Sequence, residues 1–572
     1  METSYMNTKI IVKNLLEYKL SIPEYQRAYS WEEKQYQQFL QDILEHIEYV
    51  EDYEQTPYFI GHILLEKISD SSYHIIDGQQ RVTTTVIVLA IIEKLLKEHN
   101  IEYTPLPLTH FSTVPSDKDK FQSFINTPPH ISTGYETTSL RNCAQAFIYF
   151  QKQLTQHGTA QEQIEKLQKL YNLLTHTECT VQFIDNKIDA VKRFIFENNR
   201  GKEVSKLELF KSLCMYQLYL KNAISNLEDL IRRFGKINSL LESLSTHKDN
   251  FLLQNTSRIY YNSLSIDYTP EELIHEFKKT DNSDVVQEID KFSLTLLETA
   301  EHLYQFEKED ITNQELSHTI LCLLYLGPTT EMYPFIIKAY RYNLSNKEKL
   351  SLFQYLEKLL FHIKIISTKA ELRQRLDRTD EYDVYKQWTQ NGGYQAVIDR
   401  IHLLCYADNP VSWWWNYWTK SKYLEAIEDK SNLKSRKVIR YILFKYEYAL
   451  WQKTNQSYTP HSFNDVHRPE VEHIAPQTPK QNDTGYSEYD EDFKQNYLDT
   501  IGNYILLPKK ENIQARNNSF QEKCKIYQQS PMYHIREIAQ NGKFHPENGI
   551  WDKEAIRKRN EELLNFIRNE LG

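Results

Sequence analysis

The sequence lacks several features that would assign it to a class at once. It has 68 Lys and Arg against 78 Asp and Glu, a formal net charge of -10, so a uniformly basic protein that coats nucleic acid is excluded and any phosphate binding must be local. Its six cysteines are scattered without a Cys-x-x-Cys pair. This spacing argues against a zinc ribbon or a disulfide scaffold and predicts a reducing, cytoplasmic location.

Long apolar segments are also missing. The longest uninterrupted runs, residues 86–92 and 320–326, are seven residues each, whereas a membrane helix needs about 20. The N-terminal stretch METSYMNTKIIVKN does not have the basic and then apolar pattern of a signal peptide. We therefore expect no membrane partner.

The length of 572 residues predicts more than one domain, because one hydrophobic core does not grow this large. Strand-like and helical patterns alternate near the N-terminus, a period of 3.6 residues dominates from about residue 140 to 450, and Pro, Asn, Asp and Tyr then become frequent. We expect a multidomain, mainly α protein with an α/β domain at residues 1–220, a helical connector at 221–434 and a further domain at 435–572.

The stretch YHIIDGQQRVTTTVIVLAII, which begins at residue 73, places a polar cluster between two apolar segments. We expect a strand up to Asp77, a turn at Gly78 and a helix that begins with Gln79 and Gln80. Free backbone N–H groups and the positive end of the helix dipole favour an anion at such a turn, and Arg81 adds a guanidinium suited to phosphate. The alternative is an ordinary capped helix in which Arg81 pairs with Asp77.

Two further stretches carry polar residues beside extended or loop segments. SIPEYQRAYSW, residues 21–31, places Gln26 and Arg27 before two aromatic residues. FENNRGKEVSKLELFKS, residues 196–212, includes the loop sequence NNRGK and then Ser205, which is suited to cap the following helix.

The three elements, in this order, resemble the N-terminal nucleotidase half of GmrSD-type, modification-dependent (type IV) restriction proteins, which has a ParB-like fold. The family pattern is IPxYQRxYxW, then DGQQR, then N-x-R-G-K-x-L-S, and here Val204 replaces the usual Leu. The resemblance covers about residues 10–220. It implies that the turn binds and hydrolyses a nucleoside triphosphate (GTP, UTP, CTP or ATP), with Asp77 and Arg81 as catalytic residues. The implied nucleotide-binding residues are Gln26, Arg27, Asp77, Gly78, Gln79, Gln80, Arg81, Asn199 and Lys202.

The C-terminal region carries a second polar constellation. VEHIAPQTP, residues 471–479, sets His473 at the expected end of a strand, and IGNYILLPKKEN, residues 501–512, contains Asn503 and Asn512. A neutral histidine can take a proton from water, and Glu472 and Asn512 offer oxygen ligands to a hard cation such as Mg²⁺ or Mn²⁺. We expect Asn503 to fix the His473 ring by a hydrogen bond.

Taken alone, His473 is more simply interpreted as a loop histidine near Pro476. The combined pattern, however, resembles the C-terminal HNH domain of the same restriction proteins: (D/E)HIxPQ, GNxxLL, N, FxxK and YxxS occur in order within residues 435–572. This resemblance implies a ββα-metal nuclease with His473, Asn503 and Asn512 as catalytic residues and Glu472 and Asn512 as metal ligands. The basic residues expected to hold DNA are Lys509, Lys510, Arg516, Lys523 and Lys525.

Local charge agrees with a DNA-binding C-terminus. Residues 501–572 carry 12 Lys and Arg against 9 Asp and Glu, whereas residues 481–499 carry six acids and one Lys. We expect this acidic insert to point away from DNA or to gate the site. The aromatic cluster VSWWWNYWTK, residues 411–420, could stack a modified base, but packing between the helical part and the nuclease is the favoured interpretation.

Together these patterns predict an antiphage restriction endonuclease that depends on a divalent metal and a nucleoside triphosphate and cuts or nicks double-stranded, modified phage DNA. A nucleotide-gated DNA sensor with a weak or silent nuclease is one alternative, and a toxin-like nuclease that acts on host nucleic acid is another. The oligomeric state stays open, with a homodimer among the choices.

Overall fold

The computed structural model describes most of the chain. The residues outside its description are 1–6, 24, 25, 27, 51–55, 132, 133, 136, 156–158, 185–204, 245–248, 280–283, 309–312, 368–370, 377–382, 407–416, 429–432, 434, 454–469, 479–484, 488 and 546–548.

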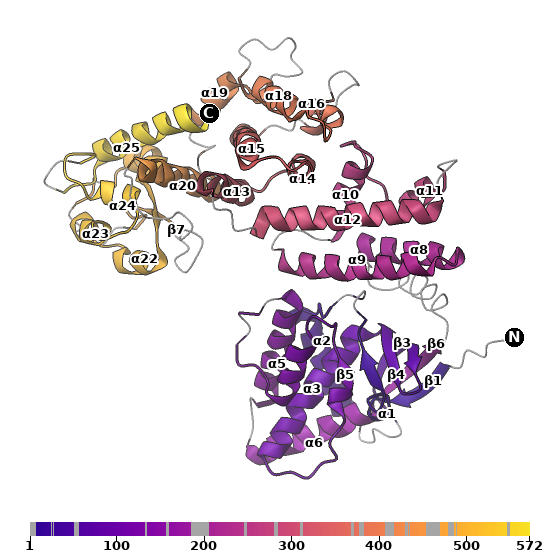
Figure 1. The fold of residues 1–572 in the computed structure, drawn as a ribbon. Coiled ribbons are helices and arrows are strands. Elements are labelled where there is room, and N and C mark those ends of the chain that lie inside the picture. Colours follow the sequence, from indigo (N-terminus) through magenta and orange to yellow (C-terminus); the bar gives the residue numbers. More distant parts are fainter. Residues whose placement is uncertain are drawn as a thin grey trace. The chain divides into compact units, whose positions relative to one another are not determined.

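The chain divides into two compact units. Unit 1 comprises Met1–Tyr261 and Ile266–Lys308, and unit 2 comprises Asn262–Ser265 and Glu309–Gly572. The expected boundary at residue 220 therefore lies inside unit 1, and that at residue 434 lies inside unit 2. Both units are mainly helical, as expected (Figure 1).

Unit 1 contains a six-stranded mixed sheet in the order β1-β6-β3-β4-β2-β5. The pairs β1/β6 and β3/β4 are antiparallel, whereas β3/β6, β2/β4 and β2/β5 are parallel. The strands are β1 Asn7–Ile11, β2 Lys19–Ser21, β3 Phe59–Ser69, β4 Ser72–Asp77, β5 Phe111–Ser112 and β6 Glu178–Ile184.

Helix α3 (Gln79–Glu98) is the central helix of the unit 1 core. It follows β4 directly, and its side chains are buried on every face from Val82 to Ile92, as expected for a helix that is apolar all round. Figure 1 shows α2 (Glu33–Tyr49), α5 (Thr138–Thr155) and α6 (Ala160–His176) gathered with α3 beside the sheet. The apolar run at residues 86–92 is therefore part of the core of unit 1.

The remaining helices of unit 1 lie between and after these elements along the chain, and α9 packs against α12. They are α1 Val12–Leu15, the 3-10 helix η1 Leu108–His110, α4 Lys118–Asn126, α8 Lys206–Leu220, α9 Ile224–Ser243, α10 Asp249–Tyr260, α11 Pro270–Lys279 and α12 Val285–Lys308.

Unit 2 begins with a helical part in which α15 packs against α13, α18 and α19. Its helices are α13 Gln314–Leu326, α14 Tyr333–Arg341, α15 Asn346–Ile366, α16 Arg373–Leu376, α17 Val384–Gln387, α18 Tyr394–Tyr406, α19 Lys420–Glu428 and α20 Arg436–Gln452. Residues 411–416 of the aromatic cluster lie outside the described residues, but Trp418 is buried and its carbonyl accepts a hydrogen bond from His362 Nδ1 at 2.7 Å.

The C-terminal part of unit 2 is built around a two-stranded antiparallel ladder. Strand β7 (Glu470–His473) pairs with β8 (Tyr504–Leu507), so that His473 lies opposite Tyr504. The helices around it are α21 Glu491–Asn496, the 3-10 helix η4 Ile501–Asn503, α22 Lys509–Ala515, α23 Phe520–Tyr527, α24 Tyr533–Ile538, α25 Lys553–Phe566 and the short π-helix η5 Ile567–Leu571.

The main sequence-based predictions of elements are confirmed. The strand and the helix expected on either side of the DGQQR turn are β4, which ends at Asp77, and α3, which begins at Gln79.

None of the helices in the described parts of the chain combines the length and apolar character that a membrane crossing requires.

Candidate functional site

The DGQQR sequence forms the expected strand, turn and helix. β4 ends at Asp77, Gly78 adopts φ 89°, and α3 begins at Gln79 without a side-chain cap. A Cβ on Gly78 would approach Ile63 Cγ1 to 3.1 Å and the His62 carbonyl oxygen to 3.2 Å. Glycine at this position therefore serves both the left-handed backbone and the close approach of β3.

Arg81 contacts protein groups from the turn. Its Nη1 donates to the Ile60 carbonyl at 2.7 Å and its Nη2 to the His62 carbonyl at 2.8 Å, and Nη2 lies 3.6 Å from Asp77 Oδ2. These contacts resemble the capped-helix alternative, in which Arg81 pairs with Asp77. The guanidinium thus joins the first turn of α3 to β3.

Gln80 connects the turn to the first sequence element. Its Oε1 accepts from the backbone N–H of Ser30 at 2.8 Å, and its Nε2 donates to the Ala28 carbonyl at 3.1 Å. One turn further along α3, the hydroxyl groups of Thr84 and Tyr29 lie 2.9 Å apart. Gln26, two residues before Ala28 in the chain, is also buried, with 4% of its surface exposed. The first two elements therefore meet in space, although they are about fifty residues apart.

The other implied nucleotide-binding residues cannot be located. Arg27, Asn199 and Lys202 lie outside the described residues. The third element is described only from Ser205, whose Oγ accepts from the Glu208 backbone N–H and caps α8 as expected.

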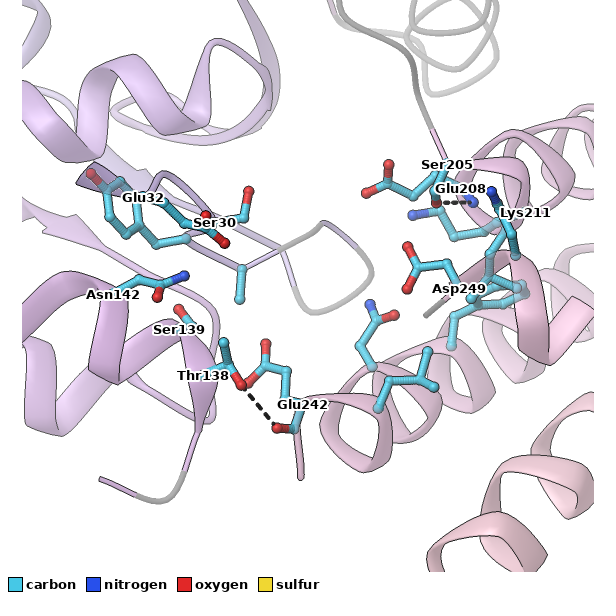
Figure 2. A pocket seen from close by; sticks show the side chains of 17 residues that line it. Ser30, Glu32, Thr138, Ser139, Asn142, Ser205, Glu208, Lys211, Glu242 and Asp249 are labelled. Carbon is cyan, nitrogen blue, oxygen red and sulfur yellow. Dashed lines mark hydrogen bonds between the residues drawn. The ribbon is translucent and has the colours of Figure 1, made fainter. Parts of the chain in front are cut away.

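A pocket of about 620 Å³ lies between the first and third elements (Figure 2). Figure 2 shows Ser30 and Glu32 on one side, with Ser205, Glu208 and Lys211 across from them. Burial lowers the pKa of Lys211. The turn residues from Asp77 to Arg81 do not line this pocket. Its complete lining is Ala28, Tyr29, Ser30, Glu32, Thr138, Ser139, Asn142, Ser205, Leu207, Glu208, Lys211, Phe234, Asn238, Leu241, Glu242, Asp249 and Asn250.

In unit 2, His473 stands at the end of β7 and is held by Asp499. Its Nε2 lies 2.9 Å from Asp499 Oδ1, and 8% of the His473 side chain is exposed. The Tyr504 hydroxyl donates to the same carboxylate oxygen at 3.1 Å. Burial and, next, the Asp499 charge raise the pKa of Tyr504, so its hydroxyl keeps its proton. An ionised carboxylate only accepts, so this contact assigns the proton to Nε2 and leaves Nδ1 as an acceptor.

Asn503 has a different role from the one expected. Its Oδ1 accepts from the Ala475 backbone N–H at 2.9 Å and from Trp551 Nε1 at 3.1 Å, while its Nδ2 donates to the carbonyls of Ala475 and Leu498. It is fully buried. Asn503 thus fixes the backbone just after His473, and the ring itself is held by Asp499.

The oxygen ligands expected for a cation lie near the start of α22. Asn512 Nδ2 donates to Glu470 Oε2 at 3.0 Å. Glu472 lies two residues after Glu470 in β7, so the two carboxylates are on the same face of the strand. The described residues contain no group of three or more His, Cys, Asp or Glu side chains arranged for a metal. Glu472, Asn512 and the unexpected Glu470 suit Mg²⁺, which uses one or two carboxylates and keeps several waters.

The expected basic residues differ in exposure. Lys509, Lys510, Arg516 and Lys525 are exposed, whereas Lys523 is 1% exposed and donates to the carbonyls of Ile474 at 2.8 Å and His473 at 3.4 Å. The prediction that Lys523 holds DNA is wrong, because its ammonium group is enclosed by the protein and supports the backbone at the histidine.

Two residues of this site were missed by the sequence reasoning. Asp499 belongs to the acidic insert, which was expected to point away or to gate the site, and Glu470 precedes the EH motif by one residue. Alternation along a strand could have placed Glu470 on the face of Glu472. No sequence signal connects Asp499 to a histidine 26 residues earlier.

Comparison with protein families accounts for both ends of the chain. Residues 9–215 match the family described as GmrSD restriction endonuclease, N-terminal domain, and residues 418–566 match GmrSD restriction endonucleases, C-terminal domain. No curated protein matches the sequence. The two domains occur in one chain, in this order, and contain the turn and the hairpin described above. The chain therefore belongs to the GmrSD restriction endonucleases.

Proposed function

We propose that this restriction endonuclease defends against phage by cleaving modified DNA with a metal-dependent centre on the β7–β8 hairpin, under the control of nucleoside triphosphate binding and hydrolysis in unit 1. The observation that carries the nuclease proposal is the contact of His473 with Asp499 at the end of β7, the strand that also carries Glu472 and the Glu470 carboxylate to which Asn512 donates. A two-stranded antiparallel ladder followed by a helix is also the framework that an HNH centre requires.

In this proposal His473 Nδ1 accepts the proton of the attacking water while Asp499 keeps the ring in one orientation and tautomer. Glu472 and Asn512, with Glu470 beside them, would hold a divalent cation, which supplies positive charge at the scissile phosphate. The exposed Lys509, Lys510 and Arg516 contact the DNA backbone. Asn503 and Lys523 keep the backbone around His473 in place.

The test is His473→Ala in the full chain, assayed with Mg²⁺ or Mn²⁺ on modified and unmodified phage DNA. Cleavage should be lost, while DNA binding, folding and triphosphate hydrolysis persist, because the imidazole acts only in the chemical step. His402→Ala, an exposed histidine of unit 2, is the matched control. Full cleavage by the His473 variant would remove the assignment. If the wild-type protein binds nucleotide and DNA but cuts nothing with any metal, the sensor alternative applies.

Two observations support the nucleotidase proposal. Gln80 of the DGQQR turn is hydrogen-bonded to Ser30 and Ala28 of the first sequence element. The N-terminus of α3 has no side-chain cap, and a helix of this length favours an anion there. Asp77→Asn preserves shape and should abolish phosphate release without changing the melting temperature. Thr84→Val removes the contacts of the Thr84 hydroxyl with Tyr29 and with the Gln80 carbonyl and serves as the control for stability effects. Unchanged phosphate release in Asp77→Asn would mean that the turn is structural.

A further inference from the structure

We propose that Asp117, Glu242 and Ser139 form a second divalent-cation site beside the unit 1 pocket, which Ser139 and Glu242 line, and separate from both the DGQQR turn and the β7–β8 hairpin. The proposal does not depend on nucleotide hydrolysis, because it rests only on three oxygen atoms and their surroundings.

Asp117 supplies a buried carboxylate with one oxygen free. Its side chain precedes α4 and is 1% exposed. Oδ1 accepts from the hydroxyls of Thr137 at 3.1 Å and Ser116 at 3.2 Å, whereas Oδ2 has no hydrogen-bond partner in the described part of the chain. Burying a carboxylate oxygen without a hydrogen-bond donor costs free energy, and a bound proton or cation at Oδ2 would offset that cost.

Glu242 supplies the second carboxylate, from the last turn of α9. Its Oε2 is buried and likewise lacks a partner among the described residues. The Thr138 hydroxyl donates to the Glu242 backbone carbonyl at 3.1 Å, and Figure 2 shows Glu242 beside Thr138 and Ser139 at the pocket wall. Burial raises the pKa of Glu242 to about 7, with the Asp117 charge acting in the same direction. Because Thr137 donates to Asp117 and the adjacent Thr138 donates to Glu242, the two acidic residues lie near each other.

Ser139 provides an independent third oxygen. It lines the pocket and is 2% exposed, and its Oγ makes no hydrogen bond of normal geometry within the described residues. The Ser139 hydroxyl lies close enough to the Asp117 carboxylate to lower its pKa, against the larger effect of burial, which raises it. Three buried oxygens that lack a well-formed hydrogen bond among the described residues indicate a group that all three would contact.

The missing group has the charge of a divalent cation. Neither Asp117 nor Glu242 forms an ion pair with any Lys, Arg or His that the structure describes. Two neighbouring buried carboxylates can both be ionised only beside a positive partner. Mg²⁺ and Mn²⁺ take one or two carboxylates and complete their shell with water. The pocket beside the site, about 620 Å³ in volume, has room for those waters.

The first test counts Mn²⁺ ions bound by the full chain, using electron paramagnetic resonance of free Mn²⁺. The double variant Asp117→Asn, Glu242→Gln should bind one ion fewer per chain than the wild type, because both charged ligands are lost at constant shape. Asp249→Asn removes one charge from the same pocket but not from the pair, and should keep the wild-type count. An equal count in the folded double variant would overturn the proposal and leave a carboxyl pair that shares a proton.

A second test needs no substitution, in case the double variant does not fold. Fe²⁺ replaces Mn²⁺ in the wild-type protein, and ascorbate with peroxide then generates radicals that cut the backbone near each bound iron. Fragments should end near residues 117, 139 and 242. A pattern without cuts at these three segments, in a protein that is cut elsewhere, would overturn the proposal.

Discussion

Asp499 holds His473 by a single hydrogen-bonding contact, and this contact sets the orientation of the ring. Its carboxylate accepts from both His473 and the Tyr504 hydroxyl, and the His473 ring also lies 4.6 Å from the Tyr504 ring. The imidazole is therefore restrained at one nitrogen and along one face. Because 48% of the Asp499 side chain is exposed, its contact with His473 adds little to the free energy of unfolding. Its main effect is to fix the orientation and the tautomer of the His473 ring.

Asp499→Asn should lower DNA cleavage by about 10- to 100-fold, the usual loss when a group that orients a functional histidine is replaced. The amide is nearly isosteric but can donate to Nε2, which stabilises the tautomer with its proton on Nδ1. Single-turnover cleavage and DNA affinity should be measured together, and only the rate should fall. Tyr504→Phe, which keeps the ring, should have a smaller effect. A cleavage rate in Asp499→Asn equal to that of the wild type would exclude the positioning role.

His362 makes unit 2 sensitive to acid. It lies in α15, fully buried, and stacks on Tyr423 with ring centroids 4.2 Å apart. Burial lowers its pKa from 6.5 to about 4. The unfolded chain therefore binds the proton more readily than the folded chain does. The contribution of neutral His362 to the stability of unit 2 is thus fully present above pH 6.5 and is lost as the pH falls toward 4.

The pKa difference of His362 corresponds to about 3 kcal/mol of unit 2 stability lost by pH 4. His362→Gln should flatten the dependence of the unfolding temperature on pH in this range, as followed by calorimetry of the full chain. His402→Gln, which changes an exposed histidine of the same unit, should not. Equal pH dependence in the wild type and in His362→Gln would contradict the prediction.

At the scale of elements, β3 and α3 are joined through a glycine that makes room for an arginine. Gly61 has φ 101°, and a Cβ there would lie 1.9 Å from Arg81 Nη1. The register of β3 shifts between Phe59 and His62, at the carbonyls that receive the guanidinium. The irregular strand and the first turn of α3 therefore form one local arrangement that presents the DGQQR turn.

Gly61→Ala should displace the Arg81 guanidinium and destabilise unit 1 by about 2 kcal/mol or more, through backbone strain and the loss of two hydrogen bonds. Gly134→Ala is the matched control, since Gly134 also has positive φ (87°) but its Cβ would meet nothing within 4 Å. Chemical denaturation measures both variants. In an Arg81→Ala background the effect of Gly61→Ala should shrink, and an undiminished effect would show that the guanidinium is not involved.

At the scale of the whole molecule, one chain contains two compact units, each with one of the two family domains. A nuclease without control would attack host DNA, so we expect the nucleotide state of unit 1 to govern cleavage by unit 2. Such control requires that nucleotide or DNA bind two states of the protein with different affinity, because tight binding by itself shifts no equilibrium.

Asp77→Asn should therefore alter DNA cleavage although it lies in the other unit, and target DNA should change the rate of triphosphate hydrolysis. Binding is the sharper measurement, because linkage requires nucleotide to change DNA affinity by the same factor as DNA changes nucleotide affinity. His473→Ala, which should bind DNA without cutting it, permits this measurement at equilibrium. Affinities that are independent of each other for every triphosphate and every DNA tested would show that the units are uncoupled.

The sequence by itself determined the features that depend on neighbours along the chain. The apolar run after DGQQR required a buried helix, Ser205 capped α8, and His473 ended a strand, because helix caps and residue periodicity act over a few positions. The order of motifs also indicated the family. The tertiary structure decided which side chains meet: Arg81 contacts β3 carbonyls, Asp499 holds His473 while Asn503 holds backbone, and Lys523 is enclosed. The residues in these contacts are 19 to 50 positions apart in the chain. Only the packing of whole helices and strands brings them together, and local sequence patterns do not record that packing.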